Sequence, residues 1–335
     1  MPRLKRLFNK YKVAKVLIAL GLLIWLVKSG RLDFHPLLAA SHSILHLMGM
    51  TVLFISMFVQ GVRWWWLLRT QKIYLSFLKT IYLIWIGQFF SLVLPGVAGG
   101  ELARGYYIIR EAPNTKIAGL STVLLDRIMG LYALLWLGIA SLLYLILSQK
   151  QLAPSTFQFG VLNLLLFSGT GLLFLALWVH PTRRLTLRLV PERLRTLVES
   201  TLNDYRIHRR DLLICFTLSL LASIMVLGVF QMASQIAQTS LSWKQVFLVC
   251  PLVFIASTLP ISPGGIGIGE TAASLLFARC GVETGATIML IYRVWLLIIR
   301  LPGGLLYIFR TSYSPFEESI KEQNLSSCKN NDLRT

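Results

Sequence analysis

Residues 94–101 read Leu-Pro-Gly-Val-Ala-Gly-Gly-Glu, and residues 259–270 read Leu-Pro-Ile-Ser-Pro-Gly-Gly-Ile-Gly-Ile-Gly-Glu. These two stretches end the apolar segments 77–100 and 244–270. Because proline lacks an amide hydrogen and glycine weakens a helix, both segments are expected to break as helices. Broken backbone at membrane depth is tolerated only where protein or a water-filled cavity surrounds it. The sequence therefore predicts two broken hairpins inside a membrane domain.

The composition is that of a membrane protein. Hydrophobic residues make up 55% of the 335 positions and charged residues only 14%, against roughly 25% charged in soluble domains. Apolar stretches of about 20 residues, each able to cross the hydrocarbon core as a helix, recur along the chain. Six are predicted to span the membrane: 13–29, 43–67, 119–146, 159–180, 212–234 and 286–309. The predicted fold is an all-α polytopic bundle, with one transmembrane domain over 1–310 and a polar tail over 311–335.

The net charge of +19 would suit nucleic acid, but its distribution indicates a membrane topology. Basic residues gather near the N-terminus and in segment 183–210, as expected for cytoplasmic segments of an inner-membrane protein. No nucleic-acid recognition module accompanies them, so that class of partner is excluded. Apolar residues at helical spacing within 183–210 predict an amphipathic helix on the inner leaflet.

The same charges indicate how the hairpins enter the membrane. With the N-terminus inside, a full crossing by 77–100 would place the basic segments 101–117 and 183–210 outside. A re-entrant hairpin keeps both on the cytoplasmic side. By the same reasoning, segment 244–285 dips in from the outer face, and both chain termini are cytoplasmic.

A repeat emerges from this topology. The order helix, broken hairpin, helix occurs over 43–146 and again over 212–309, in opposite orientation. Each break ends in a glutamate, and charged residues interrupt the next apolar helix: Asp126-Arg127 in the first repeat and Arg293 in the second. Inverted repeats with broken helices that meet near the midplane are typical of secondary transporters. The alternative is that glycine-rich breaks recur by chance in an apolar chain.

Charged side chains in these apolar segments are the candidate functional residues, because an ionised group in hydrocarbon needs a partner or a purpose. Helix N-termini that follow glycine breaks favour anions such as phosphate, and guanidinium forks suit phosphate oxygens. The predicted head-group site consists of Gly99, Gly100, Glu101, Arg104, Asp126, Arg127, Gly264, Gly265, Gly267, Glu270 and Arg293.

Structural interpretations of these charges stay open. Asp126 can simply neutralise Arg127. Arg104 and Arg300 can form structural ion pairs or extend to the membrane interface. Gln88 is a polar candidate of lower rank.

Neither a metal nor a cofactor is predicted. His42 and His46 are spaced for metal binding, but no third ligand lies nearby, so we expect them at the interface. The run Trp64-Trp65-Trp66 predicts an interfacial aromatic belt. No nucleotide-binding or nucleophile-elbow motif is present.

One family has these motifs in the same order. They are Pro95…Gly99-Gly100-Glu101-x-x-Arg104, then Leu125-Asp126-Arg127-x-x-Gly130, then Pro263-Gly264-Gly265-x-Gly267-x-Gly269-Glu270, then Arg293. From about residue 10 to 310, the chain resembles the lysylphosphatidylglycerol synthase transmembrane-region family of flippase-like proteins. The resemblance implies a helical bundle that moves, or helps to move, polar lipids between leaflets.

Two departures from the family pattern affect what can be carried over. Glu101 stands where the family more often has Asp. The soluble aminoacyl-transferase domain of the two-part synthases is missing, which argues against lipid aminoacylation by this chain.

The predicted function is therefore a flippase for an anionic or phosphate-containing lipid or glycolipid. Arg127 and Arg293 would contact the phosphate, while Glu101 and Glu270 would balance charge or relay protons. One alternative is a non-transporting accessory subunit of a membrane glycosyltransferase or lipid-modifying enzyme. Another is an intramembrane enzyme that uses Asp126 or Glu270 on a lipid phosphate. The sequence leaves the oligomeric state open.

Overall fold

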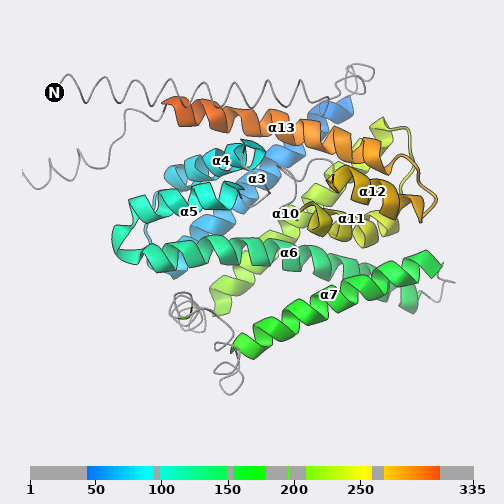
Figure 1. Ribbon diagram of the computed structural model, residues 1–335, viewed down its shortest axis with the longest axis horizontal. Helices are drawn as coiled ribbons and strands as arrows, with labels where there is room; N and C mark the ends of the chain where they lie inside the picture. Colours follow the sequence, from blue (N-terminus) through cyan, green and yellow to red (C-terminus); the bar gives the residue numbers. More distant parts are fainter. Residues whose placement is uncertain are drawn as a thin grey trace, which may run out of the picture.

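The computed structural model describes residues 44–93, 99–148, 154–178, 195, 209–258 and 268–309. All regular structure within these ranges is helical (Figure 1), which confirms the all-α class. The elements are α3 (Ile44–Thr70), α4 (Phe77–Val93), α5 (Gly99–Glu111), the 3₁₀ turn η1 (Pro113–Thr115), α6 (Lys116–Leu147), α7 (Pro154–Trp178), α10 (Arg209–Ile236), α11 (Trp243–Ser257), α12 (Ile268–Ala278) and α13 (Gly285–Phe309).

Four helices, α3, α6, α10 and α13, are long and apolar enough to cross a membrane. They correspond to four of the six predicted spans, and α7 forms a helix where the span 159–180 was predicted. The remaining predicted span, 13–29, lies outside the described residues, as do the tail 311–335 and all of 183–210 except positions 195, 209 and 210. The count of six spans and the inverted repeat stay predictions.

The first predicted break separates two antiparallel helices. Helix α4 ends at Val93 and α5 begins at Gly99. At the far end of the pair, Lys79 Nζ lies 2.6 Å from a carboxylate oxygen of Glu111. The hairpin therefore extends past its predicted limit at residue 100 as far as Glu111, because the chain resumes a helix immediately after the glycines.

The second break has the same arrangement. Helix α11 begins with a capping box, in which Ser242 and Gln245 satisfy each other's backbone amides. The Gln245 side chain also donates to the carbonyl of Cys280, just beyond α12, at 3.2 Å. Ser257, at the end of α11, lies against Gly269 in the first turn of α12. The two helices are thus antiparallel, with their connection at the Ser257 end.

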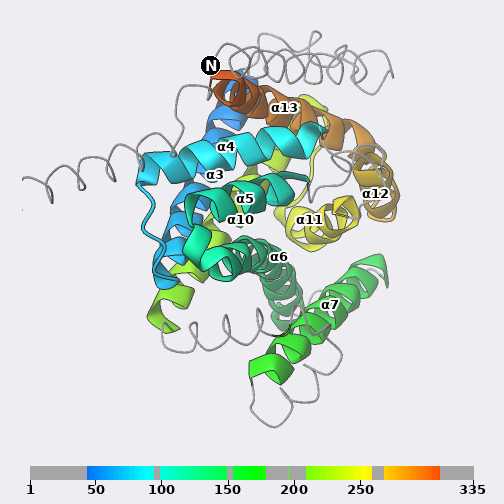
Figure 2. The same cartoon turned by 60° about the vertical axis from the view of Figure 1, so that its left-hand side comes forward.

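Long helices hold the two hairpins in one bundle (Figures 1 and 2). Helices α3 and α10 pack antiparallel along the centre, where the Ser56 hydroxyl donates to the Ala222 carbonyl at 3.4 Å. Helix α13 lies across α4, and the Tyr82 hydroxyl donates to the Leu306 carbonyl at 3.2 Å. This contact joins α4, from the first predicted repeat, to α13, from the second.

Two hydrophobic clusters stabilise the bundle. One joins α3 to α4, α5 and α6, and includes Trp64 and Ile108. The other centres on α10 to α13 and includes Phe230, Phe277 and Trp295. Many other large apolar side chains face outward, among them Leu78 and Leu143. Such an exposed apolar surface is expected for helices that contact lipid.

Candidate functional site

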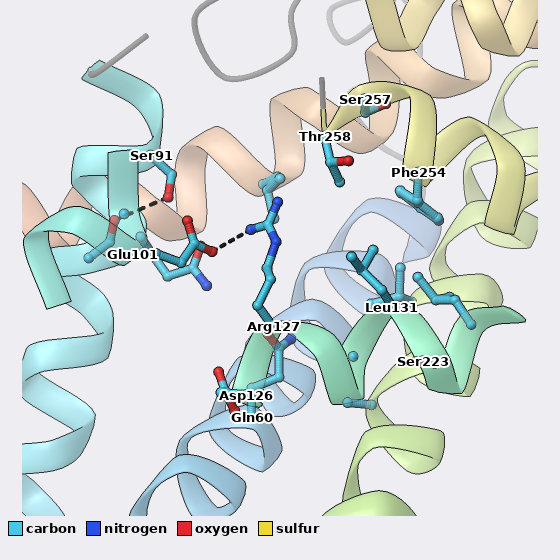
Figure 3. A pocket seen from close by; sticks show the side chains of 18 of the residues that line it. Gln60, Ser91, Glu101, Asp126, Arg127, Leu131, Ser223, Phe254, Ser257 and Thr258 are labelled. Atoms are coloured by element: carbon cyan, nitrogen blue, oxygen red, sulfur yellow. Dashed lines mark hydrogen bonds and ion pairs between the residues drawn. The ribbon is translucent and has the colours of Figure 1, made fainter. Parts of the chain in front are cut away.

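A cavity of about 260 Å³ lies between the two hairpins. Residues from seven helices line it: α3, α4, α5, α6, α10, α11 and α13. Figure 3 shows Ser91 of the first hairpin on one side of the cavity and Ser257 and Thr258 of the second on the other. The charged residues on its wall are Arg63, Glu101, Arg104, Asp126, Arg127, Arg293 and Arg300.

Glu101 and Arg127 form an ion pair across this cavity (Figure 3). Glu101 is in the first turn of α5, where free backbone amides and the helix dipole favour a negative charge. Gly100 precedes it because no side chain fits there. An added Cβ would overlap the Ser91 hydroxyl and would lie 2.5 Å from the carbonyl oxygen of Gly87. The close packing of α5 on α4 thus fixes the position of Glu101.

Glu270 and Arg293 repeat this arrangement in the second half of the chain. Their Oε1 and Nε atoms are 2.5 Å apart, and Glu270 is again in the first turn of a helix that follows a break. Gly269 precedes it, and a Cβ there would lie 2.6 Å from the Ser257 hydroxyl. Both hairpins therefore combine a serine, a glycine and a glutamate that is paired with an arginine of the next helix.

Asp126 does not neutralise Arg127, contrary to one interpretation of the sequence. Its two carboxylate oxygens accept hydrogen bonds from Arg63 Nε at 2.6 Å and from Arg104 Nη1 at 2.9 Å. Consecutive residues of a helix point in directions about 100° apart. Asp126 and Arg127 therefore face different neighbours, and Arg127 reaches Glu101 instead.

Arg63 is the residue that sequence reasoning missed. Arg63 lies near the C-terminal end of the predicted span 43–67, where a basic residue is expected at the membrane interface, yet its exposed fraction is only 4%. Besides Asp126, it donates from Nη1 to the Ser219 hydroxyl of α10 at 2.9 Å. The available signal was periodicity, because Gln60, Arg63 and Leu67 recur at helical spacing on one face of α3.

Arg104 is also buried, which excludes an interfacial position for its side chain. Its guanidinium carbon lies 4.0 Å from the centre of the Trp64 ring, a cation–π contact. Trp64 itself is fully buried and donates to the Thr122 hydroxyl at 3.1 Å. The predicted interfacial belt is therefore wrong for Trp64. Of the Arg104 nitrogens, Nε and Nη2 are buried without a hydrogen-bond partner in the described part of the chain.

Arg300 completes the cationic wall. Its side chain lines the cavity from α13. The Nε atom is buried, and no hydrogen bond or ion pair to it is formed within the ranges that the structure describes. Arg104 and Arg300 thus line the cavity and carry buried donor nitrogens that no acceptor in the described part of the chain uses.

The charges around the cavity do not cancel. Five arginines stand against three carboxylates when Glu270, the partner of Arg293, is counted. This leaves an excess of two positive charges among the described residues. The breaks 94–98 and 259–267 contain no ionisable side chain, so neither changes the balance. A concave site lined by an excess of positive charge attracts anions.

Most of the predicted site residues come together here. Gly100, Glu101, Arg104, Asp126, Arg127 and Arg293 line the cavity, as does Gln88, while Gly99 is buried at the start of α5. Glu270 does not line the cavity itself but is paired with Arg293, which does. Gly264, Gly265 and Gly267 lie outside the described residues.

The described part of the chain contains no cluster of three or more metal-ligating side chains. His42 lies outside that part. From the sequence, His46 was expected at the membrane interface, but its side chain is buried within the protein. Its Nδ1 accepts a hydrogen bond from Trp295 Nε1 at 2.9 Å. It connects α3 to α13.

The fold and the cavity together define the class of protein: a multi-pass helical membrane protein with an arginine-rich internal cavity. The chain belongs to the lysylphosphatidylglycerol synthase transmembrane-region family, whose sequence pattern matches residues 12–304. A relative described as a UPF0104 membrane protein, from Pyrococcus horikoshii, is 27% identical over 285 residues, which cover 76% of this chain and 83% of the relative. No solved structure matches this chain.

Proposed function

We propose that this protein moves a phosphate-containing polar lipid between the two leaflets of the inner membrane. The observation that carries the proposal is the excess of guanidinium groups in a cavity between two broken hairpins. Guanidinium forks bind phosphate oxygens well, and a phosphate is the charged group that most polar lipids carry. The family to which the chain belongs is compatible with a lipid-related role.

The size of the cavity fits a head group and not a whole lipid. At about 260 Å³, it is just smaller than the roughly 300–1,000 Å³ of pockets that enclose drug-sized ligands. Its wall is apolar on the side of Leu131, Val226 and Phe254. In the proposed mechanism the phosphate enters the polar side, the first methylene groups lie along the apolar side, and the acyl chains stay in the bilayer.

The two hairpins provide the proposed gates. One contributes Glu101 and the other Glu270, and each glutamate is paired with an arginine of the following helix. We propose that the hairpins are inverted repeats that open the cavity to one leaflet at a time. When an arginine turns from its glutamate to the phosphate, the carboxylate loses its counterion and can take up a proton. Phosphate binding would thus be coupled to proton uptake by Glu101 or Glu270.

Leaflet exchange in liposomes tests the proposal. The purified chain is reconstituted with labelled anionic phospholipids, aminoacylated lipids or polyprenyl-phosphate sugars, with and without an imposed proton gradient. Selective exchange is expected, with a loss of at least tenfold in the Arg127→Ala/Arg293→Ala variant. Arg110→Ala is the matched control, because Arg110 is an exposed arginine of α5 outside the cavity.

The assay also separates the alternatives. Absence of exchange for every lipid, with the protein folded, would overturn transport. In that event, loss of a glycolipid product in cells that lack the chain would support an accessory subunit of a membrane glycosyltransferase. Chemical conversion of a lipid by the purified chain alone would support an intramembrane enzyme.

A further inference from the structure

We infer that the cavity selects a head group that ends in a phosphate monoester, with two negative charges, over a phosphodiester with one. This inference rests on the proposed lipid function and specifies its substrate class. The structural basis is the combination of the charge excess, the unused donors of two arginines and the small size of the cavity.

Charge balance is the first argument. The three carboxylates already neutralise three of the five arginines, so two positive charges remain. A phosphodiester would leave one of them uncompensated beside the buried Arg104 side chain and the buried Nε of Arg300, and an unpaired buried charge is costly. A phosphate monoester carries about −1.5 to −2 charges at neutral pH. It therefore matches the excess without a further counterion.

The distribution of free donors is the second argument. Arg104 projects from α5 and is nine-tenths buried, and its Nε and Nη2 have no hydrogen-bond acceptor among the described residues. Arg300 projects from α13, and its buried Nε likewise has no acceptor within the ranges that the structure describes. Both line the same cavity. A monoester presents three terminal oxygens, whereas a diester presents two, so the monoester is better suited to accept from arginines of two different helices.

Glu101 limits where the anion can lie. Its Oε1 accepts from Arg127, while its Oε2 is buried without a donor in the described part of the chain. A phosphate beside Oε2 would be repelled, but a hydroxyl group of the ligand can donate there. The phosphate is thus placed toward Arg104 and Arg300, and its negative charge is kept away from the carboxylate.

Binding of two matched amphiphiles to the full-length purified chain tests the inference. Dodecyl phosphate is a monoester, and dodecyl methyl phosphate is the diester with the same chain and a single charge. At pH 8, calorimetry is expected to show at least tenfold tighter binding of the monoester. Since the second phosphate pKa is about 6, the preference is expected to fall below threefold at pH 5. Equal affinities at pH 8 would overturn the inference.

Two variants show whether the cavity is responsible. Arg300→Gln removes one of the two excess charges and is expected to reduce the monoester preference to less than threefold at pH 8. Arg110→Gln, outside the cavity, is expected to retain it. A preference that survives in Arg300→Gln would contradict the assigned site. Inorganic phosphate that binds as tightly as dodecyl phosphate would show that the ligand is free phosphate and not a lipid.

The inference and the proposed function can fail separately. Leaflet exchange of diester lipids with no monoester preference would leave transport standing and remove the inference. A pH-dependent monoester preference without any leaflet exchange would keep the inference and remove transport.

Discussion

Arg63 and Asp126 form a buried ion pair although 63 positions separate them in the chain. The Arg63 Nε atom is 2.6 Å from Oδ1 of Asp126, and the two side chains are 5% and 6% exposed. The pair joins α3 to α6, and Arg104 adds α5 through the second carboxylate oxygen. One carboxylate thus connects three helices beneath the cavity.

Removing that carboxylate is expected to destabilise the bundle. Asp126→Asn leaves Arg63 and Arg104 without a counterion, and the loss of one partner from a buried ion pair costs about 3–5 kcal/mol. We expect a clear decrease in the melting temperature measured by thermal denaturation in detergent. Arg110→Gln is the control, because an exposed charge contributes about 0–1 kcal/mol. An unchanged melting temperature for Asp126→Asn would contradict a structural role for the carboxylate.

The close approach of α4 and α5 predicts a second effect. Gly100→Ala places a Cβ against the Ser91 hydroxyl and the Gly87 carbonyl, and one of those atoms belongs to the backbone and cannot rotate away. Overpacking of this kind costs about 1–3 kcal/mol. Gly228→Ala, in α10, is the matched control because nothing lies within 4 Å of the new methyl group. We expect Gly100→Ala to lower both the melting temperature and the rate of leaflet exchange, and Gly228→Ala to change neither. Equal behaviour of the two variants would disprove the tight contact.

The Glu101–Arg127 pair predicts opposite effects on anion binding. Glu101→Gln removes a negative charge from the cavity wall and is expected to tighten dodecyl phosphate binding by about threefold to tenfold. Arg127→Gln removes a positive charge and is expected to weaken binding by a similar factor. Calorimetry at pH 8 measures both. If the pair served only the fold, the two variants would weaken binding alike.

Trp64 links the fold to the cavity through its ring and its indole N–H. Trp64→Phe keeps an aromatic face beneath Arg104 but loses the hydrogen bond to Thr122, whose hydroxyl still donates to the Gly119 carbonyl. The lost hydrogen bond costs about 1 kcal/mol, and the smaller ring adds a cavity cost in the buried core. Trp64→Leu also removes the cation–π contact and leaves empty volume in the core, so it is expected to be less stable than Trp64→Phe by chemical denaturation.

The sequence was most informative where local chemistry determines the outcome. The breaks before Glu101 and Glu270 could be located because proline and glycine act on their own backbone. The repeated order of glutamate and arginine marked the four residues as candidates, but their pairing across helices is seen only in the structure, which contains both pairs.

Prediction failed where remote helices determine the environment. Arg63 and Trp64 lie at the polar end of an apolar span and therefore looked interfacial. Their burial depends on Ser219 of α10 and Thr122 of α6, which no local pattern connects to α3. Asp126 was assigned to its sequence neighbour, although the directions of helical side chains decide the partner.

The glycine pair in α13 has a consequence for how this bundle can move. A Cβ on Gly303 would overlap the Trp85 carbonyl, and one on Gly304 would lie 2.7 Å from the Phe89 ring. Helix α13 and helix α4 are thus in backbone contact, and densely packed surfaces of this kind shift as a unit and do not slide smoothly. Arg293 and Arg300 sit on α13, and this helix is in equally close contact with α12, because a Cβ on Gly285 would overlap the Ala273 carbonyl. Helix α13 is therefore fixed to both hairpins, so in the proposed cycle the hairpins do not part along it, and it carries its two guanidinium groups as an element shared by both halves of the chain.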